Sequence, residues 1–220
     1  MKKIAYFFEF ILIKILFTLF QIMGYRLSSN LGFFIGRTIG PIFRSKKMII
    51  QNLEKANIQH SNLSKIASNV LGNYGRIFAE YIYLKKFRNN ELKKYVSIDG
   101  LEHLENLKKQ NKKAVFISGH FNNFELMAME IEKAGIELAA IYRPLNNIFL
   151  NKTMEKIRKE NICKNQIKKG RAGSREIIKN VIKGKSIALM IDQRVREGEK
   201  VKFFNNLATT TTIPAQLVKK

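Results

Sequence analysis

The order of apolar and polar residues divides the chain into three parts, of which the first is a long apolar segment. Residues 5–25, AYFFEFILIKILFTLFQIMGY, are long and apolar enough to cross the hydrocarbon core of a bilayer. On a helix, Lys14, Thr18 and Gln21 fall within roughly 60° of one another and form a narrow polar stripe. The pattern predicts a membrane anchor helix over residues 1–28 that spans the bilayer or lies in its interface. A buried core helix is the alternative.

The second part, residues 29–95, has apolar residues at helical spacing. SSNLGFFIGRTIGPIF, SKKMIIQNLEKA and LSKIASNVLGNYGRIFAEYIYL each predict a helix. The last of these has apolar positions at Ile66, Val70, Leu71, Ile77, Phe78 and Tyr81. We therefore expect this part to be mostly helical.

The third part alternates short apolar runs with amphipathic segments. Strands are expected at 114–118, 136–142, 162–168 and 186–192, with another possible strand at 200–204, and helices at 124–135, 150–160 and 174–184. Ser174 is the expected N-cap of the last helix, with Gly184 after its end. This alternation predicts an α/β fold with a mainly parallel central sheet flanked by helices. With three prolines and no Pro/Ser-rich linker, residues 29–220 are expected to form one domain.

The net charge and the cysteine count of the chain indicate which classes of molecule it can bind. The chain has 40 Lys and Arg against 17 Asp and Glu, a formal net charge of +23, which favours nucleic acid, anionic lipid or an acidic protein. Cys163 is the only cysteine, so it can form neither an intrachain disulfide nor a Cys-based zinc site, and it is most simply a small apolar core residue. No cofactor or metal is predicted.

Candidate chemistry follows the ends of the expected strands. His120, Arg143 and Asp192 each lie at or just past the carboxyl end of a strand, where parallel sheets bind ligands. Glu125 has two interpretations. It can close a capping box with Asn122 at a helix start, or it can accept a hydrogen bond from His120 and leave the other ring nitrogen as a general base. No G-x-S-x-G elbow is present, so a serine nucleophile is not indicated.

At these residues the sequence resembles the bacterial lipid A biosynthesis late acyltransferases, of the lauroyl/myristoyl type, and more distantly the glycerolipid acyltransferases. GHFNNFE matches the H-x4-D/E motif of that family, and YRPLNN matches its Y-R-P segment. KKGRAGSRE, LMIDQ and VKFFNNLATTTT match three further motifs in order, although Asn205 stands where a glycine is usual. The matches run from about Ser45 to the end of the chain.

The resemblance implies transfer of a fatty acyl chain from acyl carrier protein, or acyl-CoA, to a hydroxyl of a lipid A precursor. His120 would be the general base, oriented by Glu125. Arg143 and Arg171 are candidate contacts to phosphate or oxyanion, although Arg143 could instead form a surface salt bridge. Asp192 is either a contact to the acceptor sugar or a turn cap. Asn123 is also a predicted substrate-binding residue, and it lies in the same motif as His120. A phospholipid or mannoside glycolipid acceptor stays open.

Charge also suggests location and partners. Lys2 and Lys3 precede the apolar segment, whereas Arg26, Arg37, Arg44, Lys46 and Lys47 follow it. The positive-inside rule then places the catalytic domain on the cytoplasmic side of the bacterial inner membrane. Residues 151–185 hold twelve Lys and Arg against three Asp and Glu. They are either a solvated helix face or a docking surface for acyl carrier protein and anionic membrane lipid.

A nucleic-acid-binding module is the alternative from another class, with GRAG as a phosphate clamp of the KH kind. A KH clamp joins two helices, whereas GRAG is expected between a strand and a helix, and the apolar anchor is poorly explained by that interpretation. No nucleic-acid partner is therefore predicted. The resemblance also implies that further strands and helices would follow TTTTIPAQLVKK, with Pro214 in the first turn of a helix. We expect the chain to be C-terminally truncated.

Overall fold

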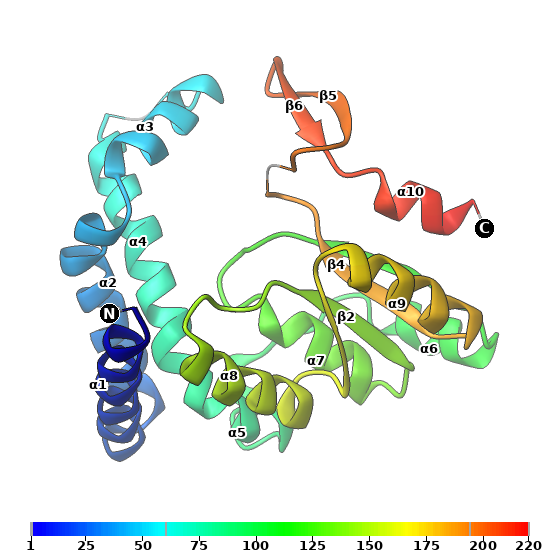
Figure 1. The fold of residues 1–220 in the computed structure, drawn as a ribbon, viewed down its shortest axis with the longest axis horizontal. Helices are drawn as coiled ribbons and strands as arrows, with labels where there is room; N and C mark the ends of the chain where they lie inside the picture. The colour runs from blue at the N-terminus through cyan, green and yellow to red at the C-terminus, as the bar shows by residue number, and fades with distance from the viewer. Residues whose placement is uncertain (1, 60, 194, 220) are drawn as a thin grey trace. The chain divides into compact units, whose positions relative to one another are not determined.

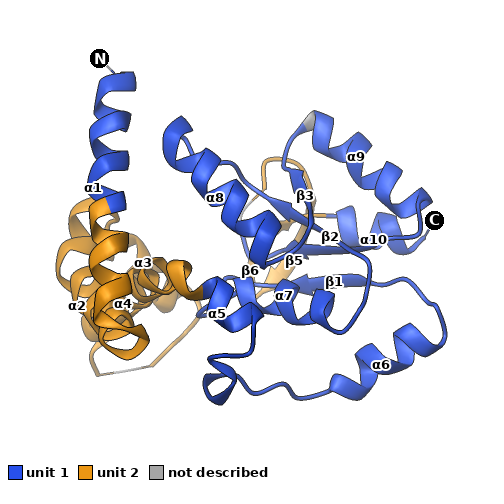
Figure 2. Ribbon diagram, turned by 90° about the horizontal axis from the view of Figure 1, so that it is seen from below, with its two compact units in different colours: residues 1–14, 84–193, 212–220 blue, residues 15–83, 194–211 orange. Residues whose placement is uncertain are grey.

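The structure is a computed structural model that describes residues 2–59, 61–193 and 195–219, without the side chain of Arg171. The chain forms two compact units, drawn in different colours in Figure 2. Unit 1 comprises residues 1–14, 84–193 and 212–220, and unit 2 comprises residues 15–83 and 194–211. Each unit is therefore assembled from segments that are distant in the sequence.

The first part of the chain is helical, as predicted. It contains α1 (Lys2–Met23), α2 (Tyr25–Phe43), α3 (Lys46–Lys55) and α4 (Leu63–Glu80) (Figure 1). Helix α1 is long and apolar enough to cross a membrane, and only 11% of its most apolar window is buried. Because Phe8, Leu12 and Ile22 are all more than half exposed, α1 is not a buried core helix.

Glu9, the acidic interruption of the apolar segment, has a partner in unit 1. Asn147 donates from Nδ2 to Glu9 Oε2 at 2.9 Å and to the backbone oxygen of Tyr6 at 2.8 Å. Phe149 packs against Phe7 and Phe10, with ring centroids 5.7 and 6.2 Å apart. The first half of α1 therefore packs on the start of α8 (Ile148–Asn161).

In unit 2, helices α2 and α4 approach closely because glycines face one another. A Cβ added to Gly75 would lie 2.1 Å from the backbone oxygen of Gly32, and one added to Gly36 would lie 2.5 Å from the backbone oxygen of Leu71. Small residues at this spacing allow two helix backbones to come into contact. Any side chain at these positions would force the two helices apart.

A buried polar cluster accompanies this contact. Glu80 is only 5% exposed and accepts hydrogen bonds from Ser29 at 2.7 Å and from Tyr25 at 3.2 Å. Arg76 donates to the Ser29 hydroxyl at 3.2 Å. Because a buried carboxylate is costly without partners, this cluster fixes the register of α2 against α4.

Unit 1 is built on a four-stranded parallel sheet in the order β1-β4-β2-β3. The strands are β1 (Val115–Ser118), β2 (Leu138–Tyr142), β3 (Asn165–Lys168) and β4 (Ser186–Met190). The other elements of the unit are α5 (Leu84–Arg88), η2 (Lys93–Tyr95), α6 (Leu101–Lys109), α7 (Glu125–Lys133), α8, α9 (Arg171–Ile182) and α10 (Ile213–Val218). The predicted α/β class with a parallel central sheet is confirmed.

Helices cover both faces of this sheet. Ala139, Ile167, Ile187 and Leu189 form a buried core with Ile177 of α9, and Ile213 and Leu217 of α10 pack against it. Helices α7 and α8 contact β2 and β3. Since alternate residues of a strand point to opposite faces, both sets of strand side chains are covered, as a parallel sheet requires.

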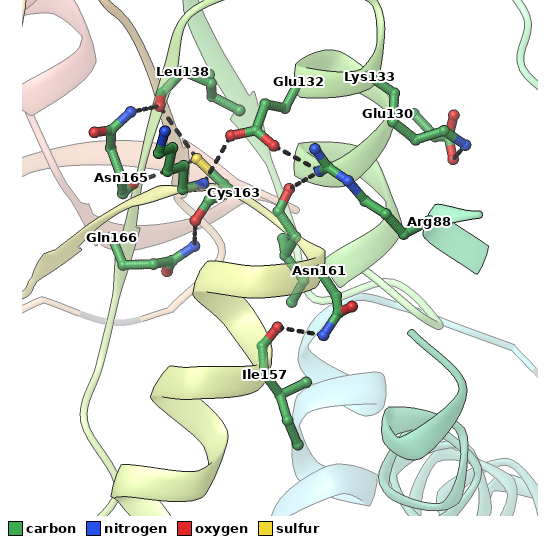
Figure 3. Close-up of polar contacts among 12 residues, drawn as sticks. Arg88, Glu130, Glu132, Lys133, Leu138, Ile157, Asn161, Cys163, Asn165 and Gln166 are labelled. Atoms are coloured by element: carbon green, nitrogen blue, oxygen red, sulfur yellow. Dashed lines mark hydrogen bonds and ion pairs between the residues drawn. The ribbon is translucent and has the colours of Figure 1, made fainter. Parts of the chain in front are cut away.

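Polar contacts fasten the helices to the sheet around Cys163 (Figure 3). Glu132 of α7 pairs with Arg88 of α5 at 2.6 Å and accepts from the backbone N–H of Lys164 at 2.7 Å. The thiol of Cys163 is fully buried and donates to the backbone oxygen of Leu138 at 3.2 Å. Burial raises the pKa of this thiol to about 11, so Cys163 acts as the predicted core residue.

Two helix starts differ from the prediction. Helix α7 begins at Glu125 with Phe124 as its N-cap, and Asn122 has a positive φ of 41°, so the capping box between Asn122 and Glu125 is wrong. Helix α9 begins three residues before Ser174, with Gly170 as its N-cap. In both places a loop conformation that favours Asn or Gly decided the boundary, rather than a side-chain cap.

The C-terminal region contains a hairpin where only one strand was expected. Strand β5 (Glu199–Phe203) pairs antiparallel with β6 (Asn206–Thr210) in unit 2. The sequence predicts no strand over the residues of β6. The helix start near Pro214 is confirmed, because Pro214 lies in the first turn of α10.

Candidate active site

The carboxyl edge of the sheet brings His120 and Asp192 together. Ser118, the last residue of β1, is opposite Met190, the last residue of β4, and the N–H of Ile191 donates to the Ser118 oxygen at 2.9 Å. His120 and Asp192 each follow their strand by two residues, so the parallel register places them side by side. The sequence predicted the common edge, but the pairing of β1 with β4 decides which side chains are neighbours.

Two hydrogen bonds join these residues. His120 Nδ1 lies 2.8 Å from Asp192 Oδ1, and the backbone N–H of His120 donates to Asp192 Oδ2 at 2.7 Å. An ionised carboxylate only accepts, so Nδ1 carries the proton and Nε2 is left with its lone pair. The imidazole is 22% exposed and the Asp192 side chain 35% exposed, so the pair is partly accessible to solvent.

Asp192 is held in its ionised form. Its partial burial would raise the pKa, but the hydrogen bonds from the backbone and the ring of His120, and the charge of the ring when protonated, outweigh burial and lower it. A carboxylate with a lowered pKa stays charged at neutral pH. It can therefore stabilise an imidazolium that forms on His120.

Neighbouring residues fix the loop that carries His120. A Cβ added to Gly119 would lie 2.7 Å from the ring of Phe121 and 3.3 Å from Asp192 Cγ, so a side chain here would displace that ring and crowd the carboxylate. The ring of Phe124 packs edge-on against the imidazole, with centroids 4.7 Å apart. The amide nitrogen of Gln193 lies 3.5 Å from His120 Nε2.

Glu125 forms a buried ion pair with Arg158 of α8. Arg158 donates from Nε and Nη2 to Glu125 Oε1 at 3.0 and 2.8 Å, and the two side chains are only 13% and 10% exposed. The carboxylate observed at Nδ1 of His120 is that of Asp192. The orienting role of Glu125 stays a prediction, because its contact with Arg158 does not test that role.

Arg158 also connects Glu125 to a second polar cluster. Its guanidinium lies over the ring of Tyr142, 5.4 Å from the centroid, and Tyr142 donates to Glu155 at 2.5 Å. Burial and the bond to Glu155 raise the pKa of Tyr142. Burial would raise the pKa of Glu155, but bonds from Tyr142, Lys168 and Asn151 lower it to about 2. This cluster fastens β2 and β3 to α8.

The other predicted site residues are distributed over the same edge. Arg143 directly follows β2 and is exposed, and within the described part of the chain it forms no ion pair. Asn123 lies between His120 and α7, and its backbone oxygen accepts from the N–H of Leu126. Arg171 is the first residue of α9, but its side chain lies outside the described residues.

Sequence reasoning missed two residues of this region. Arg158 was counted only among the basic residues of 151–185, and no spacing rule connects it to Glu125, which is on another helix. Gln193 belongs to the LMIDQ motif, but the motif alone predicts no role for it. Its position directly after Asp192 is the signal that could have found it, because the residue after a strand-end carboxylate can also reach the site.

A comparison with models of protein families identifies the family of this chain. The family model for bacterial lipid A biosynthesis acyltransferase matches residues 1–220. The chain belongs to this family. A search of curated proteins finds no match.

Membership in the lipid A biosynthesis acyltransferase family makes the chain an acyltransferase and supports activity in lipid A biosynthesis. The apolar helix α1 is consistent with membrane association. GRAG follows β3, with Gly170 as the N-cap of α9 and Arg171 as the first residue of that helix, so it does not join two helices as a KH clamp does.

Proposed function

We propose that this acyltransferase moves a fatty acyl chain, of the lauroyl or myristoyl kind, from acyl carrier protein to a hydroxyl of a phosphorylated glucosamine precursor of lipid A. Acyl-CoA is the alternative donor. The reaction would take place at the cytoplasmic face of the bacterial inner membrane. The observation that carries the proposal is the 2.8 Å contact between His120 Nδ1 and Asp192 Oδ1, within a chain that belongs to this family.

His120 is the proposed general base. Its Nε2 takes the proton of the acceptor hydroxyl as that oxygen attacks the thioester carbonyl carbon, and the imidazolium forms next to the ionised Asp192. The tetrahedral oxyanion then collapses, the carbon–sulfur bond breaks, and the thiolate recovers the proton from Nε2. General-base assistance of this kind supplies about 10²–10⁴-fold in rate. No metal or cofactor takes part in the step.

Substrate contacts are assigned to the groups around this edge. Gln193 and Arg143 are the proposed donors to the oxyanion or to a phosphate of the acceptor, because an amide N–H and a guanidinium both suit a developing negative charge. Asn123 and Arg171 remain proposed contacts to the substrate. Asp192 is proposed to orient His120 rather than to contact the acceptor sugar.

Glu125 keeps a proposed role in the site. Its carboxylate holds Arg158, which packs on Tyr142, so it would fix the start of α7 and the loop that carries His120. Its negative charge adds to that of Asp192 in favouring the imidazolium, although the pairing with Arg158 reduces this effect. We therefore expect the orienting role to belong mainly to Asp192.

The donor is proposed to dock on the basic stretch at residues 151–185. Lys152, Lys156, Lys159 and Lys179 of α8 and α9 belong to this stretch. Acyl carrier protein is acidic, and complementary charge speeds encounter between proteins. Anionic lipid could use the same residues.

The experiment is a transfer assay with the full chain reconstituted in lipid. Acyl carrier protein and CoA thioesters of lauric and myristic acid are supplied with a lipid A precursor, a lysophospholipid or a mannoside glycolipid. Products are measured by mass spectrometry. We expect acylation of the lipid A precursor, faster with the carrier protein. Acylation of only the phospholipid or the mannoside would contradict the proposed acceptor, and faster transfer from CoA would contradict the proposed donor.

A further inference from the structure

The hairpin of unit 2 presents large apolar side chains to solvent at its tip. Phe203, Phe204 and Leu207 are 65%, 53% and 69% exposed. The two phenylalanine rings pack edge to face with centroids 4.6 Å apart. Isolated exposed apolar residues are ordinary, but three such residues beside one turn indicate an interaction surface.

The backbone of the turn is shaped to place a ring there. Phe203 is opposite Asn206, so Phe204 and Asn205 form a two-residue loop, and their φ values are 45° and 60°. Such a turn needs positive φ at both positions, which Asn and Gly adopt readily. A bulky residue with positive φ is strained, and a conformation of this kind is concentrated at functional positions. Packing does not explain Phe204, because it is half exposed.

The apolar tip has basic residues beside it. Lys200 and Lys202 are two residues apart on β5, so they lie on one face of the hairpin with Leu207 and Thr209 of β6, whereas Phe203 lies on the other face. Glu199, the acidic residue of β5, is at the end of the strand distant from the turn. Apolar side chains at the tip and lysines behind it match the acyl region and the anionic head groups of a bilayer.

Other exposed apolar residues of unit 2 also favour contact with a lipid bilayer. It contains the second half of α1, the helix long enough to cross a membrane, and α2 exposes Leu27, Phe34 and Ile42. Asn206 fastens the hairpin to α3 by donating to the backbone oxygen of Lys55 at 2.8 Å. We propose that the hairpin tip, Phe203, Phe204 and Leu207, inserts into an anionic lipid bilayer as a membrane contact separate from α1. This proposal does not depend on the acceptor or donor of the acyl chain.

The absence of tryptophan from the sequence gives a direct test. Phe203→Trp introduces a single fluorescent reporter at the tip, and Leu101→Trp introduces one at a residue of unit 1 that is 42% exposed. Both full-length variants are reconstituted into vesicles of phosphatidylcholine and phosphatidylglycerol, with and without brominated acyl chains. We expect the emission of the tip reporter to be blue-shifted. We also expect the brominated chains to quench the tip reporter at least several-fold more than the control reporter.

A second variant separates insertion from folding. Phe204→Asn, made in the Phe203→Trp background, removes one ring but suits the positive φ of the turn, so the melting temperature should be unchanged or higher. We expect weaker quenching from this variant.

The proposal fails if the tip reporter is as red-shifted and as poorly quenched as the control. It also fails if the blue shift needs no lipid but follows protein concentration, which would indicate a second copy of the chain. A blue shift that appears only on addition of acyl carrier protein would likewise overturn it, in favour of a protein partner.

Discussion

Two acidic side chains, one in each unit, have opposite surroundings. Glu80 of α4 in unit 2 is buried and accepts hydrogen bonds from Ser29 and Tyr25 of α2, whereas Asp192 of unit 1 lies at a sheet edge and is about a third exposed. The partners of Glu80 hold two helices in register. Asp192 holds the ring of His120, which is 22% exposed and whose Nε2 lies 3.5 Å from the amide nitrogen of Gln193. A polar group that is enclosed by its hydrogen-bond partners stabilises the packing of the fold. A polar group can take part in catalysis when its partner has an atom that a substrate can reach.

Replacing His120 is expected to have the largest effect. His120→Ala removes the base, so turnover with acyl carrier protein and lipid A precursor should fall by about 10²–10⁴-fold. Thermal stability should change little, because the ring is partly exposed. His103→Ala is the matched control, since the His103 side chain is 80% exposed and should be dispensable. Unchanged turnover in His120→Ala would remove the basis of the mechanism.

Asp192→Asn should cause the second-largest fall in turnover. The amide cannot favour the same protonated Nδ1, so turnover should fall by about 10–10³-fold, less than for loss of the base itself. Asp99→Asn, at an exposed position, is the control. If Asp192→Asn changed only the Michaelis constant for the acceptor lipid, Asp192 would be a sugar contact and not the orienting group.

In unit 2, adding a methyl group at a helix contact should reduce stability. Gly75→Ala places a Cβ against the backbone oxygen of Gly32, and overpacking of this kind costs about 1–3 kcal/mol. Gly40→Ala is the matched control, because the nearest atom to its Cβ would belong to the Leu71 side chain, at 3.1 Å, and not to a helix backbone. Melting temperatures of the two variants in detergent give the comparison. Equal melting temperatures would mean that the glycine contact does not hold α2 against α4.

The smallest effect concerns the cluster at Glu155. Its pKa is about 2, below the usual value near 4.3, so its stabilising contribution is complete above about pH 5 and disappears as pH falls toward 2. Glu155→Gln should therefore lower the melting temperature at neutral pH by about 2–4 °C, which is about 1 kcal/mol, and by less as the solution is acidified.

Glu160→Gln on the same helix controls for the loss of a charge, because Glu160 is 57% exposed and 3.8 Å from Lys156. A difference between Glu155→Gln and the unsubstituted chain that stays constant from pH 7 to pH 3 would show that the Glu155 charge contributes nothing.

The sequence alone predicted much of the fold. The long apolar run predicted α1, and alternating apolar and amphipathic segments predicted the parallel sheet, because these patterns are local and periodic. His120, Arg143 and Asp192 could be placed at one edge, since parallel strands share their carboxyl ends. Boundaries at Asn122 and Ser174 were wrong because loop conformation, not side-chain capping, set the helix starts.

The tertiary structure decided which side chains of the candidate site pair with one another. Strand order placed β4 next to β1, and this gave His120 the carboxylate of Asp192, which is distant in the sequence. Glu125, the nearer carboxylate along the chain, pairs with Arg158 because α7 and α8 pack on neighbouring strands. The hairpin tip likewise became apparent only when β6 paired with β5. Local patterns determine which residues form a strand or a helix, whereas contacts between distant segments determine which side chains meet, because those contacts depend on how the whole sheet is ordered.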